Sequence, residues 1–228
     1  MIDPIGILRD LRNERSDWLL TVLTGVVTLL IFVFAPLRAV GIDVFHLLAI
    51  GLLIAIMSGM VIISNNRTAL VLMSIAIIAN IAVFLLRLYY PIPFHLHILA
   101  GAWLIFAGTL GIVVIQAVFG PGRITYDRII GAILLYLLIG VAFASLYLFV
   151  GVSYHNAIKG IAFGNDHAVA SEILYLSFIT LTSTGYGDIV PVHPLARSLS
   201  NIESVIGAVY PALLLARFAT LPLTGRSP

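Results

Sequence analysis

The sequence predicts an all-α integral membrane protein in which six helices cross the bilayer and a shorter helix enters it without crossing. Hydrophobic residues make up 61% of the 228 residues and charged residues only 10%, whereas soluble domains carry about 25% charged residues. A helix needs about 20 apolar residues to cross the hydrocarbon core. Six such runs follow one another along the chain: Trp18–Ala35, Val44–Ile63, Thr68–Leu86, Phe94–Phe119, Tyr126–Val150 and Leu195–Leu221.

The boundaries between these runs divide the chain into three parts. Pro36 is expected to end the first run, and the Gly120-Pro121-Gly122 break separates the fourth from the fifth. Residues 1–17 form a polar segment expected either at the membrane surface or as a solvated, frayed terminus. Residues 18–122 form a domain of four membrane helices, and residues 123–228 form a unit of two spans. Between those two spans, Glu172–Leu181 is too short to cross, so we expect it to be re-entrant and buried among protein.

Basic residues orient the chain in the membrane. If the N-terminus lies inside, the internal segments carry eight arginines and the external segments carry four basic residues. Because basic residues gather on the cytoplasmic side of membrane proteins, we expect both termini in the cytoplasm. The protein is then expected to be a multi-pass protein of the inner (plasma) membrane. The internal residues are Arg9, Arg12, Arg15, Arg67, Arg123, Arg128, Arg217 and Arg226, and the external ones are Arg38, Arg87, Lys159 and Arg197.

Composition also excludes several classes of function. A net charge of +2 with scattered basic residues gives no reason to expect a nucleic-acid partner, and the absence of cysteine excludes disulfides and thiolate metal sites. No nucleophile–base pair, metal constellation or nucleotide loop indicates an enzyme, and no cofactor is expected. The fourth run, Phe94–Phe119, contains no Arg or Lys. Steep voltage gating needs several such charges in the membrane field, so this segment is not expected to be a voltage sensor.

The most informative stretch follows the short helix and reads Thr182-Ser183-Thr184-Gly185-Tyr186-Gly187-Asp188. Consecutive backbone carbonyls point the same way only if alternate residues adopt conformations that favour glycine. Glycines at positions 185 and 187 meet that need. A row of such carbonyls can replace the hydration shell of K⁺, with a hydroxyl from Ser183 at the inner mouth and Asp188 at the outer mouth.

On these residues the chain resembles the potassium channels, over about 100 residues from Tyr126 to Leu221. The family usually has Thr and then Val or Ile before Gly-Tyr-Gly, where this chain has Ser183 and Thr184. The resemblance implies a selectivity filter formed by Ser183, Thr184, Gly185, Tyr186 and Gly187, with K⁺ held at the first four of these residues. One chain supplies one of four filter strands, so the expected partners are K⁺, the lipid bilayer and three identical subunits in a homotetramer.

Five further positions acquire roles from the same resemblance. Tyr175 lies where related channels place an aromatic side chain against the filter, although ordinary core packing is compatible with it. Thr182 and Asp188 are expected to support the filter. Gly207 and Pro211 lie where relatives bend the inner helix, and a bend there would set the width of the inner mouth. Packing alone also accounts for such residues in membrane helices.

Glu203 is the acidic residue within the apolar run Ile202–Leu215 of the sixth span. An intramembrane carboxyl group is costly unless it is paired, protonated or hydrated, so it indicates a function. We expect a neutral Glu203 to brace the back of the filter by hydrogen bonds to Thr180, Thr182 or Ser183. The alternative is that it faces the aqueous cavity and concentrates K⁺.

These observations together predict a potassium-selective channel subunit that is not steeply voltage-gated. A non-selective monovalent cation channel is the first alternative, because Ser183 and Thr184 depart from the usual filter. A subunit of a K⁺ transporter is the second. Transporters related to these channels carry several degenerate filter copies in a long chain, whereas this chain has one intact Gly-Tyr-Gly-Asp.

Overall fold

The structure is a computed structural model, and it describes residues 18–40, 71, 74, 75, 77–79, 81, 82, 95–119, 126–163 and 166–219. The first span is Trp18–Leu37. It includes the π-helical turn η1 (Leu30–Phe34) and runs into α2 (Ala35–Ala39). The elements that follow are α5 (His95–Phe119), α6 (Tyr126–Ser153), β1 (Ile158–Lys159), α7 (Asp166–Leu181), β2 (Val190–Pro191) and α8 (Pro194–Ala219).

Four helices among the described residues are long and apolar enough to cross a membrane, which confirms a helical, multi-pass membrane protein. They correspond to the first, fourth, fifth and sixth predicted spans: Trp18–Leu37, Leu96–Phe119, Tyr126–Ser153 and Pro194–Arg217. The predicted segment 1–17 and the predicted span Val44–Ile63 lie outside the described residues, and Thr68–Leu86 is described only at scattered positions. The total of six spans therefore stays a prediction.

The first span does not end at Pro36, contrary to the prediction. In a regular α-helix, the proline ring clashes with the carbonyl four residues earlier and its nitrogen donates no hydrogen bond. Here the helix widens into the π turn η1 just before the proline, and the N–H of Ala35 donates to the carbonyl of Leu30, five residues back. The wider turn lets the helix pass through Pro36 and continue to Ala39.

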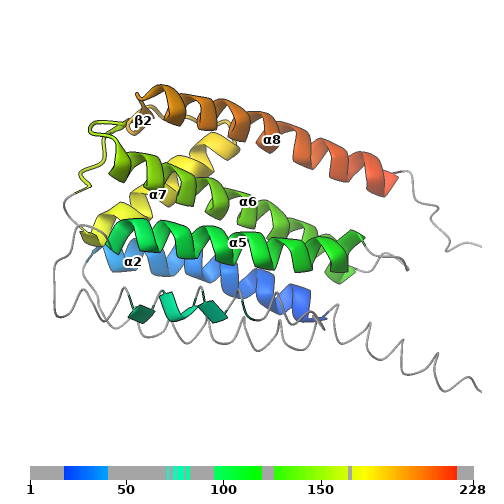
Figure 1. Cartoon of the computed structure of the whole chain (residues 1–228). Coiled ribbons are helices and arrows are strands. Elements are labelled where there is room, and N and C mark those ends of the chain that lie inside the picture. The colour runs from blue at the N-terminus through cyan, green and yellow to red at the C-terminus, as the bar shows by residue number, and fades with distance from the viewer. Residues whose placement is uncertain are drawn as a thin grey trace, which may run out of the picture.

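The short helix α7 begins at Asp166, six residues before the predicted start at Glu172. Ala168, Val169 and Ala170 extend the helix beyond the apolar run on which the prediction relied. Its 16 residues amount to about 24 Å, still less than the roughly 30 Å of hydrocarbon. In Figure 1, α7 lies obliquely to the long helices, at the end of the molecule where β2 lies.

One small correction applies to the all-α prediction. Ile158 pairs with Pro191 and Lys159 with Val190, in a two-stranded antiparallel pairing of β1 with β2. Beside it, the carbonyl of Ala157 accepts hydrogen bonds from the N–H groups of Val192 and His193, at 2.9 and 3.0 Å. Two-residue strands are too short to show an alternating hydrophobic pattern, so no pattern in the sequence predicted them.

The core centres on α6, while α8 is the least covered of the four spanning helices. In α6, 61% of the apolar window is buried, but in α8 only 11% is. On its uncovered side α8 stays apolar, as a membrane-spanning helix does where it faces lipid or other protein. Its exposed apolar residues are Leu195, Ile202, Val205, Val209, Leu213 and Leu215.

Candidate functional site

The candidate site is the 182–188 loop, Thr182–Asp188, which leaves the end of α7. Backbone hydrogen bonds hold its start against the last helical turns: the N–H of Thr182 donates to the Phe178 carbonyl and that of Thr184 to the Ile179 carbonyl, at 3.0 and 2.8 Å. The N–H of Gly185 also donates to the Ile179 carbonyl, at 3.1 Å. These bonds turn the chain back along α7, so the loop runs beside the helix that precedes it.

Backbone handedness alternates along this loop. The φ angle is +55° at Ser183, +54° at Gly185 and +82° at Gly187, whereas Thr184 and Tyr186 do not have positive φ. A Cβ at either glycine would meet no atom within 4 Å in the single chain, so the backbone conformation is what favours glycine there. The sequence predicted this alternation from the two glycines. It did not predict that Ser183 would extend the alternation by one step into a region that non-glycine residues seldom occupy.

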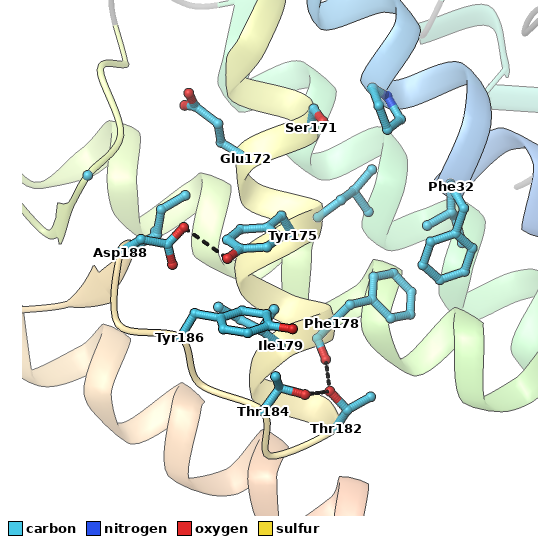
Figure 2. Close-up of a pocket in the computed structure, with 15 residues that line it drawn as sticks. Phe32, Ser171, Glu172, Tyr175, Phe178, Ile179, Thr182, Thr184, Tyr186 and Asp188 are labelled. Atoms are coloured by element: carbon cyan, nitrogen blue, oxygen red, sulfur yellow. Dashed lines mark hydrogen bonds between the residues drawn. The ribbon is translucent and has the colours of Figure 1, made fainter.

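A chain of hydroxyl contacts links the loop to α7, as Figure 2 shows. Thr182 Oγ1 donates to the carbonyl of Phe178 at 2.7 Å and lies 2.8 Å from Thr184 Oγ1. Thr184 is one of the two residues that depart from the potassium-channel pattern. Its hydroxyl therefore has a partner in the structure, which a Val or Ile at that position would lack.

At the other end of the loop, Tyr175 fastens Asp188 to α7. The Tyr175 hydroxyl donates to Asp188 Oδ2 at 2.9 Å. The rings of Tyr175 and Tyr186 lie nearly parallel, at 2°, with centroids 6.4 Å apart, and Figure 2 shows the two rings one above the other. The position predicted for an aromatic against the filter motif thus contacts the motif's tyrosine and its aspartate.

Glu203 lies behind the loop, between three helices, and its side chain has no exposed surface. Its Oε2 accepts a hydrogen bond from the Tyr147 hydroxyl of α6 at 2.8 Å, and its Oε1 lies 2.5 Å from Ser177 Oγ of α7. These are not the predicted partners, because Thr180 and Thr182 donate to carbonyls of their own helix instead. Complete burial within the chain also gives no support to the alternative in which Glu203 faces an aqueous cavity.

At Gly207 the backbone of α8 lies close to the end of α7. A Cβ built at this residue would lie 1.8 Å from the carbonyl oxygen of Leu181, which also accepts a hydrogen bond from Tyr136 at 3.1 Å. Pro211 lies within a helix that continues through it, and its side chain is exposed. The contact gives Gly207 a packing role beside the hinge role that the sequence suggested.

Beside the loop, a groove of about 770 Å³ opens between the first span and α7. Phe32 and Pro36 line one side, and Tyr175, Phe178 and Tyr186 line the other. The rings of Phe32 and Phe178 are tilted, with centroids 5.1 Å apart. Glu172 also lines the groove, and partial burial raises the pKa of its carboxyl group. The first span therefore reaches the same helix that carries the loop.

Sequence reasoning missed two residues of this site. Tyr147 lies 56 residues from Glu203 along the chain and Ser177 lies 26 residues from it, and neither belongs to a recognisable motif. The sequence feature that could have identified Ser177 is its polar side chain in an otherwise apolar helix. A polar side chain in such a position needs a hydrogen-bond partner.

Comparison with known proteins agrees with this geometry. A protein-family model described as an ion channel matches residues 131–223, which covers most of α6, all of α7 and the loop, and α8. Protein LctB of Geobacillus stearothermophilus is 33% identical over 78 residues, covering 33% of this chain and 58% of that protein. Protein LctB of Bacillus caldotenax is 29% identical over 98 residues, covering 42% of this chain and 72% of that protein.

The matched part spans less than two thirds of the first of these relatives. No solved structure matches the chain. The matched residues 131–223 contain the Gly-Tyr-Gly motif together with the helices that position it. Over residues 131–223 the chain is therefore similar to ion channels, as the resemblance of its Thr180–Asp188 stretch to the potassium channels predicted.

Proposed function

We propose that this chain is one subunit of a potassium-selective channel that conducts K⁺ passively through a homotetrameric pore. The observation that carries the proposal is the alternation of positive φ at Ser183, Gly185 and Gly187. That alternation is the backbone pattern needed to turn successive carbonyls toward one axis. Rings of such carbonyls replace the water around a K⁺ ion.

In this proposal, K⁺ is held by the carbonyls of Ser183, Thr184, Gly185 and Tyr186 and by the Ser183 hydroxyl, and Gly187 completes the filter. Residues 182–188 are all exposed in the single chain. Such exposure is consistent with a loop whose other side faces an axis shared with further copies. The C-terminal end of α7 carries a partial negative charge and would favour a cation at the inner end of the filter.

The homotetramer is supported by α8, because its uncovered side is apolar. Exposed apolar surface of this extent on a spanning helix faces lipid, a further subunit or a pore. Four copies around an axis would bury part of it against neighbouring subunits. They would also bring four filter strands together, as a K⁺ filter requires.

Several residues would support the filter. Tyr175 and Asp188 would hold its outer end, and the Thr182–Thr184 hydroxyl pair would hold its inner end. Glu203 would brace α7 through Ser177. Gly207 and Pro211 would act on the inner helix, with Gly207 setting how closely that helix approaches the filter.

The membrane assignment and the gating belong to the same proposal. Both termini would lie in the cytoplasm, with the Asp188 end of the filter facing outward across the inner membrane. Because the described α5 has no Arg or Lys along its length, the channel would open without a steep dependence on voltage.

The test is electrical recording of the purified protein in liposomes with K⁺ on one side and Na⁺ on the other. A reversal potential near that of K⁺ supports the proposal, whereas one near zero favours the non-selective cation channel. Unitary currents separate a channel from a transporter subunit, because transporters do not produce them. The Gly185→Ala variant should lose selectivity or conduction, since an alanine disfavours the required positive φ. Gly108→Ala is the control, because a Cβ there meets nothing within 4 Å in an ordinary helix.

A further inference from the structure

The hydrogen-bonding cluster around Glu203 contains three short oxygen–oxygen contacts. Ser177 Oγ lies 2.7 Å from the carbonyl oxygen of Gly140 and 2.5 Å from Glu203 Oε1. The Tyr147 hydroxyl oxygen lies 2.8 Å from Glu203 Oε2. Each distance is typical of an O–H···O hydrogen bond. Each contact therefore needs one proton between its two oxygens.

Counting the protons shows that the hydroxyl groups alone cannot supply them. Ser177 and Tyr147 each carry one hydroxyl proton, and the backbone carbonyl of Gly140 carries none. Three contacts therefore have two hydroxyl protons. Sharing the Ser177 proton between two acceptors would lengthen both contacts, but the two distances from Ser177 Oγ are the shortest in the cluster.

We infer that Glu203 carries the third proton and donates it to Ser177. Ser177 then donates to the Gly140 carbonyl, and Tyr147 donates to the other oxygen of the carboxyl group. In this arrangement the neutral carboxyl group uses one oxygen as donor and the other as acceptor, and every contact in the cluster is satisfied. The positions of the oxygens carry this inference, whatever ion the channel conducts.

The surroundings of Glu203 favour the neutral form as well. The carboxyl group is fully buried, and an ionised carboxylate in such a place needs a cationic partner or several donors. Within the described residues, its hydrogen-bond partners are the two uncharged hydroxyls. Among the residues that the structure describes, the titratable groups that face it are phenols of α6, Tyr147 in contact and Tyr136 further away. A phenol that loses its proton becomes negative, so neither can stabilise a carboxylate charge.

The proton would give Glu203 a positioning role, which rests on the proposed function. Ser177 lies four residues before Leu181, where α7 ends and the proposed filter begins. The chain of contacts from α8 through Glu203 and Ser177 to Gly140 of α6 fixes this part of α7 between two spanning helices. The cluster is complete while the carboxyl group keeps its proton and loses one hydrogen bond as rising pH removes it. The filter should therefore lose its fixed geometry at alkaline pH.

Infrared spectroscopy of the full-length protein in lipid tests the protonation state directly. The difference spectrum between the wild type and Glu203→Gln should contain the carbonyl stretching band of one protonated carboxyl group per subunit, shifted in D₂O. If the difference spectrum contained the bands of an ionised carboxylate and not the band of a protonated carboxyl group, the inference would be overturned. Glutamine keeps one donor and one acceptor, so this variant should fold. Tyr147→Phe is a second test: it removes one donor to the carboxyl group and should move the band to higher frequency, and an unmoved band would contradict the assignment.

The positioning role is tested by a pH titration of the same samples. In the wild type, the K⁺ over Na⁺ permeability ratio and the thermal midpoint of the assembled protein should both fall as the infrared band disappears. In Glu203→Gln both should stay constant over that range. A wild-type ratio and midpoint that stay constant while the band disappears would refute the positioning role. Infrared and thermal measurements need no current, so they remain decisive even if the protein proves not to select K⁺.

Discussion

Replacing Gly207 by alanine should disturb the proposed filter, even though this residue lies on α8. The added Cβ would lie 1.8 Å from the carbonyl oxygen of Leu181, and a carbon and an oxygen approach no closer than about 3.3 Å. The two backbones must therefore separate by about 1.5 Å. The obstructing atom belongs to the backbone, so no side-chain rotation can relieve the contact.

The expected cost follows from comparable overpacked sites. Forcing an extra carbon into a packed interior costs about 1–3 kcal/mol. The movement would also weaken the hydrogen bond from Tyr136 to the same Leu181 oxygen. Because Leu181 directly precedes Thr182, the displacement passes into the 182–188 loop. We expect both a lower thermal midpoint and a changed K⁺ over Na⁺ permeability ratio.

Two measurements decide this prediction: the thermal midpoint of the purified protein in detergent and the reversal potential in liposomes. Gly108→Ala is the matched control, since its Cβ would have no neighbour within 4 Å and alanine is the better helix former. If Gly207→Ala matched this control in both measurements, the close contact would not matter. A change in open probability alone would restore the hinge role suggested by the sequence.

Two of three further predictions concern the filter, and the third concerns α5. Thr184→Val should loosen the inner end of the filter and lower its K⁺ over Na⁺ selectivity. Thr184→Ser should keep the hydroxyl contact and most of the selectivity. Equal K⁺ over Na⁺ permeability ratios in the two variants would show that the hydroxyl is irrelevant. Tyr175→Phe removes the hydrogen bond to Asp188 and should shorten the time for which the channel conducts before its current declines. An unchanged time course would show that this hydrogen bond does not stabilise the conducting filter. Open probability should vary weakly with voltage, with a gating charge far below three or four per subunit; a steep activation curve in liposomes would contradict this.

The sequence was sufficient for features that depend on local pattern. Composition and apolar runs predicted the helical membrane protein, and the Gly-Tyr-Gly spacing predicted the alternating backbone of the loop. Prediction was weaker where the structural effect of a residue depends on the residues around it. Pro36 is a helix breaker by its chemistry, and only the π turn before it lets the helix continue.

The contacts of Glu203 and Gly207 show why the tertiary contacts of the site could not be predicted from the sequence. A buried acid predicts that hydrogen-bond partners exist, but their identity depends on which helices pack together. Ser177 and Tyr147 become partners only after α6, α7 and α8 are assembled. A glycine in a helix predicts either flexibility or close packing. The position of the Leu181 carbonyl, which no local pattern reveals, distinguishes the two.

The pairing of β1 with β2 has a mechanical consequence for the loop beside it. Residues 182–189 run between two anchors, the end of α7 and the β2 strand held by β1 and Ala157. The distance between the anchors is set by the helices, so the number of residues that bridge it is set as well. Side chains along this stretch can vary, as Ser183 and Thr184 do, while its length cannot. A single inserted or deleted residue would displace every carbonyl in the row.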